Sequence, residues 1–312
     1  MVNRIPKSDH MVYPIRDFCN SFSKEFCIRT ELNSSGAGTL NSTMRPLKVS
    51  QCFDIVDGVL QYQYTKVLYM DGKDTYMART HTRLPSNLDI SLRREDLTEI
   101  TFIPVESHCP RHVAEFTLAP EPLPEDCYIK RPDLISYREG SNISEAVLND
   151  IRACETLRRY PHPNIAKYYG CQVHSGRVTG LCFAKYPETL MERVNPGHLN
   201  KDELSQKAPQ STRNKLNHYL MGIKQGIDHM HSLGLVHNDI TPTNFMITPD
   251  DIPVIIDFDS CLPEGLQLGL TKRTFQWHDP SAQFSCASND DWAFKEICTW
   301  LVDDREISAY QE

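Results

Sequence analysis

The sequence of 312 residues predicts an α+β protein in which a β-rich part precedes a helical part. Short β-branched and aromatic runs, such as Gln61–Met70 and Cys127–Lys130, predict strands in the first part. Apolar residues at three- and four-residue spacing predict helices over Ser144–Tyr160 and Ser211–Ser232. The chain is long enough to form two lobes around a sizeable core, or two modest domains.

Composition is typical of a globular protein, with 40% apolar and 24% charged residues. The formal net charge of −8 argues against a nucleic acid or an anionic membrane as partner. No apolar run reaches the roughly 18 residues of a transmembrane helix, and Met1–Asp17 lacks the apolar core of a secretory signal. Eleven cysteines without a C-x-x-C pair predict reduced thiols in a cytoplasmic or nuclear protein. Cys171, Cys182 and Cys261 are expected to be small core residues.

Residues 1–97 are interpreted as an N-terminal extension whose structure the pattern leaves open between a small β-rich unit and a poorly ordered segment. They contain no catalytic constellation, so we expect a separate domain over residues 98–312. The predicted elements of the extension are strands over Val49–Val59 and Gln61–Met70, a hairpin turn at Asp71-Gly72, and a returning strand over Thr75–Ala78.

Between residues 98 and 186 the pattern predicts five strands around one helix. The helix Ser144–Tyr160 begins at a capping serine and is stopped by Pro161 and Pro163. The strands, in chain order, are Glu99–Ile103, Val113–Phe116, Cys127–Lys130, Ala166–Val173 and Val178–Tyr186. The order is therefore three strands, one helix and two further strands.

Residues 187–312 are predicted to be mainly helical. The expected helices are a polar segment from Thr189 to Arg193, the long helix Ser211–Ser232, which ends before Gly234, and Asp290–Val302. A short hairpin interrupts them, because Phe245–Ile247 and Val254–Ile256 are apolar and turn residues lie between them.

Polar residues lie on both sides of this hairpin. His237, Asp239 and Asn244 precede its first strand, and Asp257 follows its second. An antiparallel hairpin brings the end of its second strand beside the start of its first, so Asn244 and Asp257 should be neighbours. Carboxylate and amide oxygens are ligands that Mg²⁺ prefers, and a further carboxylate can orient an attacking hydroxyl. The pattern therefore indicates a metal and phosphate site.

The spacing of these residues resembles the catalytic core of protein kinases. His237, Asp239 and Asn244 match the H-x-D-x-x-x-x-N loop, and Asp257 with Phe258 matches the start of D-F-G. The resemblance implies that Asp239 is the catalytic base or orienter of the attacking hydroxyl. It also implies a catalytic role for Asn244, with Asn244 and Asp257 as Mg ligands.

The family resemblance implies a two-lobed protein kinase-like fold that binds ATP and Mg. The β-rich N-lobe would cover about residues 98–186, and a shortened helical C-lobe about residues 187–312. Segments such as PHPNI, LVHND and IDFDS are similar to those of divergent kinase-like proteins of filamentous fungi.

Three more positions take roles from the resemblance. Lys130 ends a short strand, as the ATP-binding and catalytic lysine of kinases does, although it could also be a surface lysine. Its acidic partner on the following helix is left open between Asp150 and Glu155. Asp290 resembles the aspartate that binds the catalytic-loop backbone, which is compatible with an acid favoured at a helix N-terminus.

Several parts of the family pattern are missing. No glycine occurs between Glu99 and Lys130, so the glycine-rich phosphate loop is absent. Asn238 replaces the arginine of His-Arg-Asp, so control by activation-loop phosphorylation through that arginine is not expected. Thr241 stands where Ser/Thr kinases place a lysine near the γ-phosphate.

Asp259 replaces the glycine of D-F-G, where its carboxylate either recruits a cation or stiffens the loop. The segment Lys272–Pro280 resembles the end of an activation segment, without its A-P-E motif.

The leading functional prediction is ATP- and Mg-dependent phosphoryl transfer by a protein serine/threonine kinase, with ATP and an unidentified protein substrate as partners. The alternative is a catalytically weak or inactive pseudokinase that acts as a binding or scaffold module, since the glycine-rich loop is missing. A second alternative is a small-molecule kinase, for which a shortened C-lobe is less of a handicap. Neither a nucleic acid nor a membrane is expected as a partner.

Overall fold

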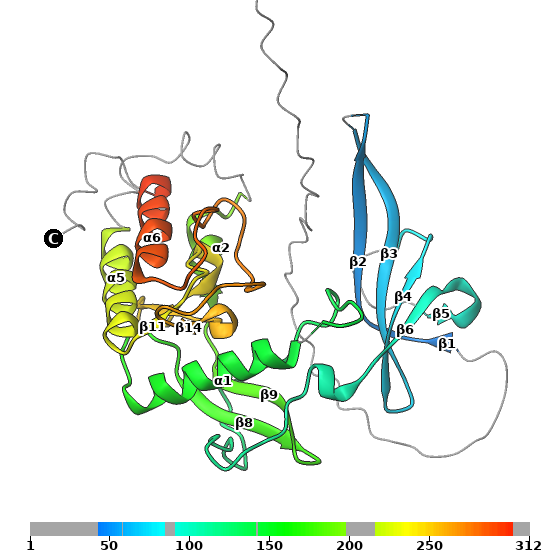
Figure 1. Cartoon of the computed structure of the whole chain (residues 1–312), viewed down its shortest axis with the longest axis horizontal. Helices are drawn as coiled ribbons and strands as arrows, with labels where there is room; N and C mark the ends of the chain where they lie inside the picture. Colours follow the sequence, from blue (N-terminus) through cyan, green and yellow to red (C-terminus); the bar gives the residue numbers. More distant parts are fainter. Residues whose placement is uncertain (1–42, 58, 85–90, 142, 198–215, 302–312) are drawn as a thin grey trace, which may run out of the picture. The chain divides into compact units, whose positions relative to one another are not determined.

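The computed structural model describes residues 43–57, 59–84, 91–141, 143–197 and 216–301, which form two compact units (Figure 1). The first unit contains the described residues up to Val105 together with Asp133–Ser141, and the second contains the other described residues. Most of the sequence before the first predicted strand, the start of the predicted helix Ser211–Ser232, and Val302 lie outside the described residues.

The first unit is built on an antiparallel sheet of four strands in the order β2-β3-β4-β6. The strands are β2 (Pro46–Val56), β3 (Val59–Asp71), β4 (Asp74–Thr80) and β6 (Thr98–Ile103), with a small pair formed by β1 (Thr43–Met44) and β5 (Leu92–Arg93). Asp71 pairs with Asp74 across the turn at Gly72, whose φ of +62° favours glycine. The three strands and the turn predicted in this region are confirmed.

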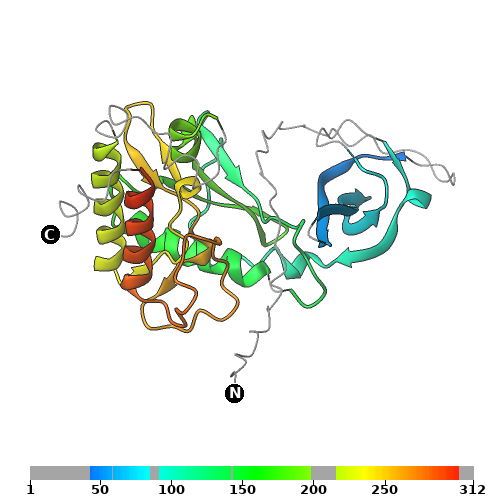
Figure 2. The ribbon, with the colours of Figure 1, turned by 90° about the horizontal axis from the view of Figure 1, so that it is seen from above.

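The core of the first unit lies against one face of this sheet, which curves around it (Figure 2). Val67, Tyr69 and Ala78 are fully buried there, and the Tyr69 ring stacks on Tyr76. The strand predicted at Glu99–Ile103 exists, but its expected place in the kinase-like domain is wrong. It is β6, and its pairing with β4 makes it part of the first unit.

The second unit begins with a sheet of three strands in the order β7-β9-β8. The strands are β7 (Cys127–Lys130), β8 (Tyr168–His174) and β9 (Arg177–Ala184), and helix α1 (Ile143–Arg159) lies along the sheet. The predictions of these three strands and of the helix are confirmed. Cys171 and Cys182 are 1% and 0% exposed, as expected of core residues.

The strand predicted at Val113–Phe116 is wrong. The chain makes isolated bridges instead, of which one joins Leu118 to Cys171 on β8. Gly170 allows this close approach, because a Cβ on it would lie 2.6 Å from the backbone of Leu118 and Ala119. The segment therefore follows the outer edge of β8, which is the far edge of the sheet from β7.

The remaining part of the second unit is mainly helical. Its long helices α5 (Asn217–Ser232) and α6 (Ala287–Leu301) lie side by side, as Figures 1 and 2 both show. The shorter elements are β10 (Glu188–Thr189), α2 (Leu190–Val194), β11 (Leu235–Val236), β12 (Phe245–Ile247), β13 (Pro253–Ile255) and β14 (Leu262–Pro263). Ile223, Ile227 and Ile297 are fully buried between the helices and the hairpin. No helix in the described part of the chain is long and apolar enough to cross a membrane.

Candidate active site

The hairpin of β12 and β13 brings the two halves of the predicted site together. Phe245 pairs with Ile255, and the Ile256 N–H donates to the Asn244 carbonyl at 3.0 Å. Gly226 on α5 lets the helix approach this hairpin, since a Cβ there would lie 2.9 Å from the Ile255 side chain. Asn244 and Asp257 therefore lie at the same end of the hairpin, as the sequence predicts.

The loop before β12 is held by the ring of His237. Its Nε2–H donates to the Ile256 carbonyl at 3.0 Å, and its Nδ1 accepts the Asp239 N–H at 3.3 Å. A ring nitrogen that accepts a hydrogen bond carries no proton, so these partners assign a neutral imidazole. His237 is fully buried, and it connects the loop that carries Asp239 to the strand that leads into Asp257.

Asp290, near the start of α6, binds the backbone of the same loop. Its carboxylate accepts the N–H groups of His237 and Asn238, each at 2.8 Å, and it lies 2.9 Å from His231 Nε2. The carboxylate is 1% exposed. Burial lowers the pKa of His231, but the bond to Asp290 and the charges of Asp290, Asp291 and Asp228 together outweigh burial and raise it.

Asn238 makes the conformation of this loop possible. Its φ of 62° lies in the left-handed region, which asparagine adopts more readily than most residues. The side-chain amide donates to the carbonyls of Val236 and Ser260 and to Ser285 Oγ. This buried residue therefore has a structural role at the position where the family resemblance places the arginine of His-Arg-Asp.

Lys130, at the end of β7, forms ion pairs with Asp150 on α1 and with Asp257. Of the two helix acids left open by the sequence, Asp150 is the partner. Burial would lower the pKa of Lys130, but Asp150 and Asp257 raise it well above its usual value. Burial likewise would raise the pKa of Asp257, and the charges of Lys130 and Lys272 instead lower it. Burial raises the pKa of Asp150 against the opposing effect of Lys130, but direct contact with an ammonium group favours its ionised form.

Glu155 is not the partner of Lys130, which corrects its prediction as an auxiliary site residue. It lies five residues after Asp150, which is about 140° around a helix of 3.6 residues per turn. Its carboxylate accepts the Thr117 N–H at 2.6 Å and the Thr117 hydroxyl at 2.9 Å. Glu155 therefore fastens the segment that runs along β8 to α1.

Asp239 and Asn244 face each other inside the loop. The Asn244 amide nitrogen donates to the Asp239 carbonyl at 2.8 Å and to Asp239 Oδ2 at 3.3 Å, which leaves the Asn244 amide oxygen for a cation. The described residues contain no cluster of three or more His, Cys, Asp or Glu side chains suited to a metal. An ion here would therefore need phosphate oxygens and water besides Asn244 and Asp257, which is how Mg²⁺ is usually held with nucleotides.

The part of the loop around Thr241 carries no cation of its own. Thr241 is 1% exposed, and its hydroxyl lies 2.8 Å from Thr243 Oγ1. No lysine or arginine occurs between His237 and Asn244. The cation near Asp239 comes instead from Lys272, whose Nζ lies 3.9 Å from Asp239 Oδ2, 3.5 Å from Asp257 Oδ2 and 3.8 Å from Asp259 Oδ2.

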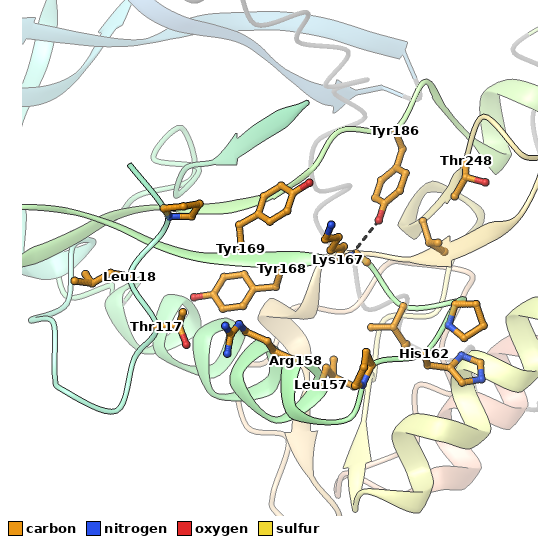
Figure 3. A pocket seen from close by; sticks show the side chains of 16 residues that line it. Thr117, Leu118, Leu157, Arg158, His162, Lys167, Tyr168, Tyr169, Tyr186 and Thr248 are labelled. Carbon is orange, nitrogen blue, oxygen red and sulfur yellow. Dashed lines mark hydrogen bonds between the residues drawn. The ribbon is translucent and has the colours of Figure 1, made fainter. Parts of the chain in front are cut away.

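A separate pocket of about 910 Å³ lies elsewhere in the second unit (Figure 3). Arg158, Lys167 and the ring of Tyr169 line it, and the Tyr186 hydroxyl accepts the Lys167 N–H at 3.0 Å. None of the predicted site residues lines this pocket, so it is distinct from the group around Asp257.

Comparison with known proteins agrees with this geometry. Residues 130–267 match the protein kinase domain family. The chain is 28% identical over 138 residues to MAP kinase kinase kinase win1 of Schizosaccharomyces pombe, covering 43% of this chain and 9% of that protein. It is 31% identical over 103 residues to mouse dual specificity testis-specific protein kinase 1, covering 33% of this chain and 15% of that protein. Over 132 residues it is 27% identical to MAP kinase kinase kinase SSK2 of Saccharomyces cerevisiae, covering 42% of this chain and 7% of that protein.

The fold and the matched region point to the same kind of domain. Residues 130–267 are similar to the protein kinase domain, and this similarity covers less than half of the 312 residues. The chain spans less than a sixth of the length of the three relatives compared above.

Two residues of the site were not identified from sequence as members of it. Lys272 lies 33 positions after Asp239, and nothing in its local sequence separates it from a surface lysine. For Asn238, the sequence showed only that it replaces the arginine of His-Arg-Asp. The signal that could have identified Asn238 was its residue type, because asparagine is enriched at left-handed positions in tight loops.

Proposed function

We propose that this chain binds ATP with Mg²⁺ and transfers the γ-phosphoryl group to a serine or threonine hydroxyl of a protein. The observation that carries the proposal is the paired arrangement of Lys130 with Asp150 and Asp257. Phosphoryl transfer depends mainly on positioning and on charge stabilisation, and this lysine and carboxylate supply both. Transfer to a protein hydroxyl is taken from the kind of kinases that the chain resembles.

In this proposal each residue has a limited task. Lys130 pairs with phosphate oxygens of the nucleotide, while Asp150 keeps its ammonium in place. Asn244 and Asp257 would hold Mg²⁺, which would supply positive charge to neutralise the transferring group. Asp239 orients the attacking hydroxyl and accepts its proton late, because a loose transition state requires little early deprotonation.

A binding module without transfer activity is the second candidate. The segment before β7 follows the far edge of the sheet, so the described residues provide no glycine-rich turn beside Lys130. In addition, the Thr274 N–H donates to Asp239 Oδ1 at 2.7 Å, which occupies one oxygen of the expected base. A protein of this kind would bind the nucleotide and leave it intact.

Thermal unfolding with and without Mg·ATP tests nucleotide binding. A ligand that binds the native state raises its stability by mass action, so Mg·ATP should raise the midpoint for the wild type and not for Asp257→Asn. Asp71→Asn is the matched control, because Asp71 is an exposed carboxylate on the first unit. No shift for the wild type, or an equal shift for Asp257→Asn, would contradict the proposal.

Transfer of labelled phosphate from ATP separates the two candidates. The wild type should label proteins in a mixed extract in the presence of Mg²⁺, and the label should disappear with EDTA or with Asp239→Ala. Nucleotide binding without any transfer would favour the binding module. Transfer to metabolites alone would favour a small-molecule kinase.

A further inference from the structure

Lys272 places a cation beside Asp239, in a loop that has no lysine or arginine of its own between His237 and Asn244. Its Nζ lies within 4.0 Å of Asp239, Asp257 and Asp259, the three carboxylates of the predicted centre. Lys130 is already paired with Asp150 and Asp257. Lys272 is therefore the nearer counter-charge for Asp239 and Asp259 among the residues that the structure describes.

The backbone around Lys272 is anchored to the site. The Ser260 hydroxyl donates to the Lys272 carbonyl at 2.8 Å, and the Thr274 N–H donates to Asp239 Oδ1 at 2.7 Å. Two residues of the site thus hold the chain immediately at and after Lys272. These backbone bonds, together with the attraction between its ammonium and the carboxylates, place Lys272 at the site.

The side chain of Lys272 makes no tight contact with these carboxylates. It is 60% exposed, and its contacts of 3.5–3.9 Å are longer than tight charge-assisted hydrogen bonds of about 2.7–2.9 Å. A lysine ammonium on a four-carbon stem can change partners without a change in the backbone. Partial burial would lower the pKa of Lys272, but the surrounding carboxylates raise it, so the group stays charged at neutral pH.

We propose that Lys272 replaces, from a distant segment, the phosphate-facing cation that Thr241 cannot supply, and that Asp259 recruits it. In the nucleotide-free protein Lys272 neutralises Asp239, Asp257 and Asp259. When Mg·ATP is bound, its ammonium turns to the γ-phosphate and stabilises the charge that is transferred. This inference rests on the proposed nucleotide binding at the same site.

Binding measurements without turnover test the neutralising role of Lys272 in the nucleotide-free protein and its contact with the γ-phosphate in the nucleotide complex. With Mn²⁺ alone, Lys272→Met should bind the ion about tenfold more tightly than the wild type, because a competing positive charge has been removed. With Mg²⁺ present, the preference for ATP over ADP should fall about tenfold in Lys272→Met, because the γ-phosphate has lost a partner. Lys272→Arg should keep both values within about threefold of the wild type, since it retains the charge.

Two controls complete the test. Lys73→Met makes the same change at an exposed position of the first unit and should alter neither quantity. The far-UV circular dichroism spectrum of the ligand-free Lys272→Met variant should match that of the wild type, because the side chain is largely exposed and contributes little to the core.

The outcomes separate the inference from the proposed function. Nucleotide binding by the wild type with an unchanged preference for ATP over ADP in Lys272→Met would overturn the inference and leave the proposed function standing. An unchanged Mn²⁺ affinity would overturn the neutralising role of Lys272. Absence of nucleotide binding by the wild type would overturn the proposed function together with the phosphate-facing role.

Discussion

The metal side and the phosphate side of the candidate site are built differently. On the metal side, where Mg²⁺ is proposed to bind, the hairpin holds Asn244 and Asp257 close together, and Asp257 is paired with Lys130. On the phosphate side, Thr241 is a small buried residue, and the nearest cation reaches in from Lys272 on a separate segment. Under the proposed roles, the expected metal ligands are retained, while the cation expected near the phosphate comes from a different segment.

The sharpest test of the metal side compares two acids on α1. Asp150→Asn should lower the phosphoryl-transfer rate by about 10²–10³-fold, because Lys130 loses the carboxylate that positions it. Glu155→Gln should change the rate less than about threefold, since Glu155 binds Thr117 instead. Initial rates at saturating Mg·ATP measure both. Equal losses in the two variants would contradict the assignment of Asp150.

The loop that carries Asp239 and Asn244 is held in place by Asp290. Replacing it by alanine should lower the free energy of unfolding by about 3 kcal/mol, because two buried backbone N–H groups and His231 lose their acceptor. Chemical denaturation measures the loss. Asp291→Ala, an exposed neighbour on the same helix, is the control and should cost less than about 0.5 kcal/mol.

The segment on the far edge of the sheet depends on Gly170. Gly170→Ala should lower the free energy of unfolding by about 2–3 kcal/mol, since the new Cβ meets the backbone of Leu118 at 2.6 Å and the φ of +137° is unfavourable for alanine. Gly176→Ala has positive φ without a close neighbour and should cost only about 1 kcal/mol. A cost for Gly170→Ala no larger than that for Gly176→Ala would argue against the close approach.

The smallest expected effect is a pH dependence from His231. The folded state raises the pKa of His231, so the contribution is fully present below the unfolded value of 6.5 and is lost as the pH rises through the folded pKa. Asp228, Asp290 and Asp291 supply the negative charge that acts on this ring. We expect His231→Gln to remove on the order of 1 kcal/mol of this pH-dependent stability. Urea unfolding of both proteins at pH 5.5 and pH 8 checks it, and equal differences at the two pH values would contradict the assignment.

The local pattern of apolar and polar residues was sufficient to predict most strands and helices of the second unit. Apolar and β-branched runs predicted β7, β8 and β9 closely, and helical spacing predicted α1, because these signals lie within each segment. The hairpin between Asn244 and Asp257 was predictable for the same reason. The choice of Asp150 over Glu155 was not, because it depends on which face of α1 meets the sheet.

The sequence by itself determined that Asp239, Asn244 and Asp257 come together, since a short antiparallel hairpin leaves little freedom in how its ends meet. Tertiary structure decided that β6 pairs with β4 and that the segment after it follows β8 instead of extending the sheet beside β7. It also decided that Lys272 joins the site from 33 residues away. Contacts of this range depend on how distant surfaces pack, and local propensity carries no information about them.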